Sequence, residues 1–249
     1  MPVERTCVGD NMADPVIYGD GSTDYEKYIR TQELYRLQKG PKEWANEEEL
    51  LFQTIHQAME LWLKIVIQHL EQSVAWVKAD KLRDATRFIK RAASMIEFLG
   101  DSLKFPMSIA PWDYHKIRMG LGKGSGQESP GFNKLLDSPE KLWQAYAATL
   151  KRHKKTIDEV HQDPHGLPDL FELTIAMSEL DQELMHWRYR HFQLVKRIIG
   201  DAVMSLKGIP ASALEKNGNM AFFPEIWAVI NRTTNAYNQK YRPQGGGAY

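Results

Sequence analysis

Two long stretches without internal glycine or proline constrain this chain more than any other feature of its sequence. One runs from Glu49 through Lys64 and continues to about Val77, and the other runs from Pro168 to Ile199. In both, apolar residues recur at intervals of three and four, which is the spacing of a helix with a wide buried face. Because nothing inside either stretch breaks a helix, each predicts one long helix that lies against a core.

Each predicted long helix carries one histidine on its apolar stripe. The two stripes consist of Phe52, His56, Met59 and Leu63 in the first helix, and of Leu184, Trp187, His191, Leu194 and Ile198 in the second. Histidines in such positions are often ordinary core residues. They also suit haem, which needs a neutral imidazole ligand, a confined pocket on the opposite side of the iron, and apolar walls. The residues alone leave both interpretations open.

The remaining chain predicts shorter helices and no strand. We expect these helices at Tyr25–Leu37, Asp80–Gly100, Trp112–Leu121, residues 139–161 and Pro224–Lys240. Thr23 or Asp24 is suited to cap the first of them, and Asn46 with Glu49 resembles a capping box at the start of the first long helix. No segment alternates polar and apolar residues over a useful length. The predicted fold is therefore all-α, a single helical-bundle domain with long antiparallel helices.

The two ends of the chain are expected to lie outside this bundle. Residues 1–23 are polar and rich in glycine and aspartate, so we predict a flexible N-terminal arm there. The helical domain is predicted to occupy residues 24–240, followed by a disordered tail over residues 241–249. A chain of 249 residues is long enough to bury a substantial core.

The composition excludes several classes of function. Lysine plus arginine equals aspartate plus glutamate at 32 each, so the chain lacks the basic excess that favours nucleic acids or membrane surfaces. Cys7 is the single cysteine, which excludes an internal disulfide framework and fits a reducing compartment. No apolar run approaches the ~20 residues that span a bilayer, and the start of the sequence has no signal-peptide core. We therefore predict a cytoplasmic protein.

Three further motifs have ordinary structural interpretations. The glycine-rich segment 120–131 lacks the Gly-Lys-Ser/Thr signature of a phosphate-binding loop, so we interpret it as a loop whose backbone approaches another group closely. The basic run at residues 151–155 is interpreted as a solvated helix end. His161 and His165 have no further metal ligands at a suitable spacing, and a turn between helices explains them.

Five short sequence blocks lie at particular distances from one another along the chain. They are Tyr25-x-x-Tyr28-Ile29, Phe52-x-x-x-His56-Gln57-x-x-Glu60-Leu61-Trp62, Pro111-x-x-Tyr114-x-x-x-Arg118, Ser125-Gly126 with Ser129, and Trp187-Arg188-Tyr189-Arg190-His191. In content, order and spacing these blocks resemble the tryptophan 2,3-dioxygenase family. The resemblance extends from about Tyr25 to Gly200, and its Ser125 block matches the family's Ser-Gly-Phe-Gln-Ser loop only in part.

The resemblance implies a haem-dependent oxygenase that uses dioxygen as its co-substrate. It implies that the long helices enclose a pocket for haem b, in which His191 is the axial ligand of the iron. Trp62, Ser125 and Gly126 would also lie at the cofactor.

The same resemblance implies roles around a small aromatic amino acid substrate. His56 would be the catalytic residue on the other side of the haem and would accept the indole N–H, while Arg118 would pair with the substrate carboxylate. The other implied substrate-binding residues are Phe52, Tyr114, Tyr25, Tyr28 and Ile29. Because the family's tyrosines near the N-terminus reach into a neighbouring subunit, a homo-oligomer is expected, specifically a dimer of dimers that forms a homotetramer.

The sequence departs from the family after Gly200. The family carries a Gly-Thr-Gly-Gly-Ser-Ser-Gly loop that closes over the substrate, whereas residues 202–210 here read Ala-Val-Met-Ser-Leu-Lys-Gly-Ile-Pro. Ser205 carries the only hydroxyl near the family's threonine, so it is the candidate substrate-binding residue of this segment. The wider superfamily includes secondary-metabolism members that insert one oxygen atom, giving oxindoles from tryptophan derivatives or hydroxylating tyrosine.

The expected function is therefore oxidation of the indole C2–C3 region of L-tryptophan or a substituted tryptophan. The enzyme would act as a dioxygenase, or as a monooxygenase that gives an oxindole. The alternatives are a haem-dependent hydroxylase of tyrosine or another aromatic amino acid, a non-catalytic haem-binding sensor, and a helical interaction protein without a cofactor.

Overall fold

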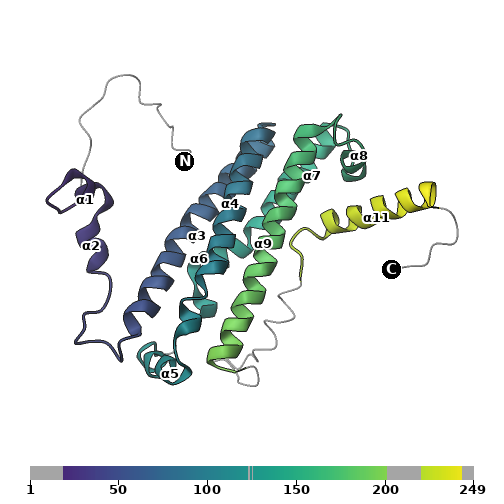
Figure 1. Ribbon diagram of the computed structural model, residues 1–249. Coiled ribbons are helices and arrows are strands. Elements are labelled where there is room, and N and C mark those ends of the chain that lie inside the picture. Colours follow the sequence, from purple (N-terminus) through teal and green to yellow (C-terminus); the bar gives the residue numbers. More distant parts are fainter. Residues whose placement is uncertain (1–18, 123, 125, 201–219, 243–249) are drawn as a thin grey trace.

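The computed structural model describes residues 19–242, except for positions 123 and 125 and the segment 201–219. Every regular element in this part of the chain is a helix, which confirms the all-α prediction. Three long helices form the body of the molecule, namely α3 (Glu49–Lys78), α4 (Leu82–Ser102) and α9 (Pro168–Ile198) (Figure 1). α3 and α9 are the two long helices that the uninterrupted apolar stripes predicted.

The polar contacts between the long helices define their directions. α3 and α4 are antiparallel, since only a short turn joins them. α4 and α9 run in parallel, because Arg83 pairs with Asp169 near the start of both helices and Asp101 pairs with Arg190 towards their ends. α4 lies between α3 and α9 in this arrangement (Figure 1).

A single apolar core joins the long helices to their neighbours. Its fully buried members include Leu63, Val66, Ile89, Ile96, Leu173 and Leu180. Full burial of an aliphatic side chain of this size contributes about 1.5–3 kcal/mol to stability. Because these residues face one another along the whole length of the helices, the core fixes their relative positions.

Shorter helices complete the bundle. They are α5 (Pro111–Gly120), α6 (Pro130–Leu136), α7 (Ser138–Arg152), α8 (Ile157–Gln162) and α11 (Pro224–Tyr241), with 3-10 turns at Pro106–Ser108 and Gly126–Glu128. α6 and α7 pack on α3, α8 packs on α11, and α5 lies at the end of the bundle where α3 begins (Figure 1). None of the described helices combines the length and the apolar character that crossing a bilayer requires.

The prediction of one helix over Tyr25–Leu37 is wrong. The structure has two short helices there, α1 (Asp24–Ile29) and α2 (Thr31–Tyr35). Arg30, which lies between them, has a left-handed conformation with φ of 59°, and this ends the hydrogen-bond ladder of α1. The predicted cap at Thr23 is confirmed, since its hydroxyl accepts the backbone N–H of Glu26 at 3.2 Å.

The predicted helix over residues 139–161 is also broken. α7 ends at Arg152, and Lys154 then takes a left-handed conformation with φ of 53°. Thr156 and Glu159 form a capping box that starts α8 in a new direction. The basic run at residues 151–155 therefore lies partly at the end of α7 and partly in the loop between α7 and α8.

The capping box predicted for Asn46 and Glu49 does not form. Asn46 Oδ1 accepts the backbone N–H of Glu48 at 3.0 Å instead. The Glu49 carboxylate is almost fully buried and accepts hydrogen bonds from Ala45 N at 2.5 Å and from Lys39 Nζ at 2.6 Å. Glu49 therefore fixes the chain that precedes α3.

One buried carboxylate attaches α11 to α9. Asp181 is fully buried, and its oxygens accept the backbone N–H groups of Phe222 at 2.9 Å and Phe223 at 3.0 Å. The indole N–H of Trp227 donates to the same carboxylate at 2.8 Å. Three donors that lie before and within α11 thus depend on one side chain of α9.

Replacing Asp181 by alanine leaves one buried donor, Phe223 N, and two part-buried donors without their acceptor. Because an unsatisfied buried N–H costs about 1–3 kcal/mol, we expect Asp181→Ala to lower the free energy of unfolding by about 2–3 kcal/mol in urea titrations. Asp169→Ala is the matched control, since the exposed Asp169–Arg83 pair is worth less than about 1 kcal/mol. Equal losses in the two variants would contradict this account.

Candidate active site

Side chains from two separate sequence blocks gather near the beginning of α3. Phe52 and His56 lie one turn apart on α3, and their ring centroids are 4.2 Å apart. The ring of Tyr114, on α5, lies 6.0 Å from that of Phe52. Asn46 holds α5 in place, because its Nδ2 donates to the carbonyl oxygen of Asp113 at 2.9 Å.

Arg118 follows Tyr114 by one turn of α5. Burial raises the pKa of Tyr114, and the positive charge of Arg118 opposes this rise, so the guanidinium lies within electrostatic range of the phenol. Arg118 is half-buried, and no described carboxylate forms an ion pair with it. A guanidinium in this state is able to bind a carboxylate from outside the chain through paired charge-assisted hydrogen bonds.

The hydrogen bonding of His56 determines its tautomer. His56 Nδ1 lies 2.6 Å from the carbonyl oxygen of Phe52. Because a carbonyl oxygen only accepts, Nδ1 carries the hydrogen and Nε2 keeps a free lone pair. The ring is open to solvent in the isolated chain, yet the atoms around it desolvate the imidazole enough to lower its pKa. His56 is thus a neutral, accessible hydrogen-bond acceptor.

His191 lies on α9 among apolar and aromatic groups. Burial lowers the pKa of its imidazole to about 4, and the charge of His56 lowers this pKa as well. The ring is therefore neutral near pH 7. No described group forms a hydrogen bond with its nitrogens. The influence of His56 on this pKa indicates that the two imidazoles lie within electrostatic range of each other.

Three aromatic rings border one another beside α6. Trp187 lies one turn before His191, with centroids 5.0 Å apart and ring planes inclined by only 9°. Phe132 of α6 stacks on Trp187 at 3.9 Å with an inclination of 25°. The indole N–H of Trp187 is buried and has no acceptor within the described chain.

Glu60 connects α3 to the start of α6. Its carboxylate accepts a short hydrogen bond from the Ser129 hydroxyl and another from the backbone N–H of Gly131 at 3.0 Å. A Cβ atom at Gly131 would lie 2.6 Å from Glu60 Oε2 and 2.9 Å from Leu63 Cβ, so only glycine fits there. Glu60 lies one turn after His56, and its negative charge partly offsets the lowering of the His56 pKa by desolvation.

The predicted cofactor residue Trp62 lies apart from this cluster. It packs against Phe98 of α4 with ring centroids 5.2 Å apart. Its position is six residues beyond His56, or about 120° around the helix axis. Gly126 begins an exposed 3-10 turn. Two further predicted residues, Ser125 and Ser205, lie outside the described residues.

The three substrate-binding residues predicted near the N-terminus are exposed in the described structure. Tyr25 is 72% exposed, Tyr28 is 74% exposed and Ile29 is 41% exposed. They lie on α1, which buries none of its residues. The single chain therefore leaves three large apolar side chains without a partner.

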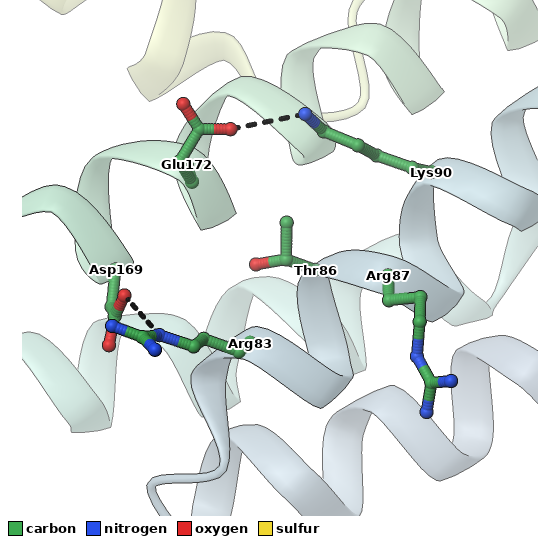
Figure 2. A pocket seen from close by; sticks show the side chains of 6 residues that line it. All are labelled: Arg83, Thr86, Arg87, Lys90, Asp169 and Glu172. Atoms are coloured by element: carbon green, nitrogen blue, oxygen red, sulfur yellow. Dashed lines mark hydrogen bonds and ion pairs between the residues drawn. The ribbon is translucent and has the colours of Figure 1, made fainter.

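An open groove between α4 and α9 offers no rival site. It is lined by Arg83, Thr86, Arg87, Lys90, Asp169 and Glu172 (Figure 2). Two ion pairs cross it, Arg83–Asp169 at 2.9 Å and Lys90–Glu172 at 3.1 Å, so most of its charge is neutralised internally. In the described part of the chain, no group of three or more histidine, cysteine, aspartate or glutamate side chains is placed to hold a metal ion directly.

Comparison with known proteins identifies the family. The model of the tryptophan 2,3-dioxygenase family matches residues 10–139, more than half of the chain. The chain belongs to this family. It is therefore an oxygenase of the tryptophan 2,3-dioxygenase superfamily, and the structure brings together the α3 and α5 blocks that lie within the match.

Three relatives named tryptophan 2,3-dioxygenase illustrate the distance within the family. The protein of Bacillus thuringiensis (strain Al Hakam) is 24% identical over 255 residues, covering 82% of this chain and 91% of the relative. That of Myxococcus xanthus (strain DK1622) is 24% identical over 265 residues, covering 86% and 91%. That of Erythrobacter litoralis (strain HTCC2594) is 27% identical over 257 residues, covering 82% and 96%. The similarity extends well beyond the residues that the family model matches.

Haem is the cofactor that the family implies, and the described residues fit it. An iron ligand must be a neutral imidazole with an available nitrogen, which is the state of His191. Rings of Trp187 and Phe132 supply an apolar wall beside it. The unused indole N–H of Trp187 adds a donor that the described chain itself leaves unsatisfied.

Sequence reasoning assigned no role to Glu60 or Phe132. The signal for Phe132 was the Ser129-Pro130 pair, which marks a helix start because Ser129 caps α6 and proline suits its first turn. Glu60 gave no such signal, because its partners lie 69 and 71 residues away and only the folded chain brings them together.

A methyl group at Gly131 would collide with the Glu60 carboxylate and Leu63. We expect Gly131→Ala to lower the free energy of unfolding by about 1–3 kcal/mol, the usual cost of overpacking, as measured by urea denaturation. Gly126→Ala is the control, since no atom lies within 4 Å of a Cβ built there. If Gly131→Ala is as stable as Gly126→Ala, the close approach of α6 to α3 is not required.

Proposed function

We propose that this protein binds haem through His191 and oxidises the indole C2–C3 region of L-tryptophan or a substituted tryptophan. One observation carries the proposal: a neutral accepting imidazole at His56 lies within electrostatic range of the partly buried imidazole of His191. The unpaired guanidinium of Arg118 lies in the same cluster through Tyr114 and Phe52. Family membership supports the same assignment.

His56 would orient the indole by accepting its N–H at Nε2. The bond from Nδ1 to the Phe52 carbonyl holds the tautomer that keeps Nε2 free. Nε2 need not remove the proton, because a hydrogen bond suffices to hold the ring. The rings of Phe52 and Tyr114 would contact the faces of the indole and displace water from it.

Arg118 would hold the substrate carboxylate. A planar guanidinium presents two parallel N–H donors to a carboxylate, whereas an ammonium offers a single point charge. With the carboxylate at α5 and the indole N–H at α3, the amino acid would be fixed at both ends. Haem held by His191 would supply the redox chemistry that activates dioxygen.

We further propose that the exposed arm completes the site of a neighbouring subunit. Tyr25, Tyr28 and Ile29 would pack against the substrate pocket of a second copy, within a dimer of dimers. Their exposure on α1 supports this assignment. A cytoplasmic location is proposed from the single Cys7, which suits a reducing compartment. The roles of Trp62, Ser125, Gly126 and Ser205, and the domain limits at residues 24 and 240, remain predictions.

Insertion of a single oxygen atom into the substrate is the second candidate reaction. The sequence of residues 202–210 has a single glycine where the family has a glycine-rich loop, so fewer backbone N–H groups can approach the substrate closely. This difference favours a monooxygenase that gives an oxindole. Both candidates share His191, His56 and Arg118, and they differ only in the product.

The proposal predicts one haem per chain with a Soret band that depends on His191. His191→Ala should lose this band, whereas His186→Ala, which alters an exposed histidine of the same helix, should keep it. With L-tryptophan and labelled dioxygen, the product mass should rise by two labelled atoms for a dioxygenase and one for a monooxygenase. Oxygen uptake that is absent with every indole or phenol amino acid would leave only a haem sensor, and a band that survives His191→Ala would refute the ligand.

Arg118→Lys and Arg118→Ala should both raise KM for L-tryptophan. Loss of charge-assisted hydrogen bonds worth about 1.5–3 kcal/mol corresponds to a rise of roughly 10- to 100-fold. Arg87→Ala, an exposed arginine of α4, should leave KM unchanged. Steady-state oxygen uptake measures all three, and an unaltered KM in both Arg118 variants would remove Arg118 from the substrate site.

Protonation of His56 removes the lone pair that accepts the indole N–H. Since burial lowers the pKa of His56 below its usual value of 6.5, the neutral acceptor persists at and above neutral pH. Affinity for L-tryptophan should therefore be constant near pH 7 and fall as the pH drops through this lowered pKa, as followed by absorbance titration. His56→Phe should bind more weakly and lose this pH step, and an unchanged step in that variant would assign it to another group.

A further inference from the structure

We propose that Phe132 and Trp187 act as positioning residues that set the ring plane of His191, and that Glu60 holds them in place. This inference rests on the proposed function, in which His191 is the iron ligand. We name the stacked rings of Phe132 and Trp187 the aromatic brace.

Among the described residues, Trp187 is the one aromatic ring that stacks on the His191 ring. Histidines that bind metals usually donate their second ring N–H to a carboxylate or carbonyl, and this bond fixes the ring plane. No described group makes such a bond with His191. Trp187 lies almost parallel to the imidazole instead, at 5.0 Å and 9°, so rotation of the imidazole would bring its edge against the indole face.

Phe132 prevents the indole from moving with the imidazole. Its ring stacks on Trp187 at 3.9 Å and comes from a different helix, α6. An aromatic pair of this kind is favourable beyond the area it buries. The orientation of His191 therefore depends on where α6 lies with respect to α9.

Hydrogen bonds to α3 fix that position. The backbone N–H of Phe132 donates to Ser129 Oγ at 3.1 Å, and the same hydroxyl donates to Glu60. Gly131 N donates to the other carboxylate oxygen at 3.0 Å, and the close contact with Leu63 leaves no room for adjustment. Glu60 is thus connected to the His191 ring through Ser129, Phe132 and Trp187 in turn.

The connection begins beside the residue that faces the substrate. Glu60 lies one turn after His56 on α3, so a rigid helix joins the acceptor of the indole N–H to the carboxylate that anchors the brace. The relative orientation of the two imidazoles would then be set by α3, α6 and α9 together. A displacement of α6 would change the ligand plane without touching the iron.

The stacked ring matters in this account, and the indole N–H does not. That N–H is buried and has no acceptor in the described chain. Trp187→Phe retains a ring in the brace and removes the unsatisfied donor, whereas Trp187→Leu removes the ring. The two variants separate orientation of the imidazole from mere filling of space.

Electron paramagnetic resonance of the ferric, haem-loaded protein with cyanide tests the proposal. The g values of low-spin iron depend on the plane of the axial imidazole, so the native protein and Trp187→Phe should each give one narrow set. Trp187→Leu and Glu60→Ala should give a broadened or second set with shifted g values, because the ring then adopts more than one orientation. Trp76→Leu is the matched control, since this half-buried tryptophan of α3 contacts Phe88 away from the brace, and it should give the native set.

If both Trp187→Leu and Glu60→Ala give the g values of the native protein, the proposal that the aromatic brace sets the His191 ring plane is wrong. If Trp187→Leu fails to fold, as judged by circular dichroism, Glu60→Ala decides in the same way: a shifted set supports the brace, and the native set refutes it. If the proposed function is wrong, the spectra differ from both of these outcomes. In that case the native protein itself gives no low-spin signal with haem and cyanide, or gives one that His191→Ala leaves unchanged.

Discussion

The packing of α4 between α3 and α9 is the constraint on which the rest of the structure depends. Fully buried aliphatic side chains line all three helices, and the ion pairs Arg83–Asp169 and Asp101–Arg190 show that α4 and α9 run in parallel. A helix cannot slide in such a core without exposing apolar surface at about 25 cal/mol per Å². Fixed register is what allows His56 on α3 and His191 on α9 to lie within electrostatic range of each other.

The two imidazoles have different surroundings, and these suit different roles. Both pKa values are lowered by burial, so both rings are neutral. His56 is fixed by a hydrogen bond to the Phe52 carbonyl and keeps a nitrogen open to solvent, as a residue that meets a substrate requires. His191 is partly buried and stacks against Trp187, and no described group bonds to its ring nitrogens, so a nitrogen is available for the iron in the proposed function. The distinction comes from the environment rather than from the residue type.

Much of this fold was predictable from the sequence, for a definite reason. α3 and α9 have uninterrupted apolar stripes, and their observed limits agree with the prediction within about a residue. The breaks at Arg30 and Lys154 were not predictable, because a residue other than glycine enters the left-handed region only when its surroundings compensate the strain. The capping box at Glu49 failed for a similar reason, since Lys39 and the backbone of Ala45 bind its carboxylate.

The candidate site likewise contains residues that the sequence predicts and residues that it does not. His56, Phe52 and Tyr114 share features that a sequence displays, namely position on a helix face and spacing within a block, and the structure brings them together. Glu60 and Phe132 act through contacts between distant segments, which no local pattern encodes. Trp62 belongs to the same block as His56, but the helix turns it towards Phe98 on another side of α3. Its predicted place at the cofactor therefore stays a prediction.

The most direct test of the central claim is a crystal structure of the protein with haem and L-tryptophan, prepared without oxygen. The account predicts iron bound to a ring nitrogen of His191, the indole nitrogen within hydrogen-bond distance of His56 Nε2, and the carboxylate on Arg118. Iron bound to any other residue, or an indole N–H directed away from His56, would contradict it.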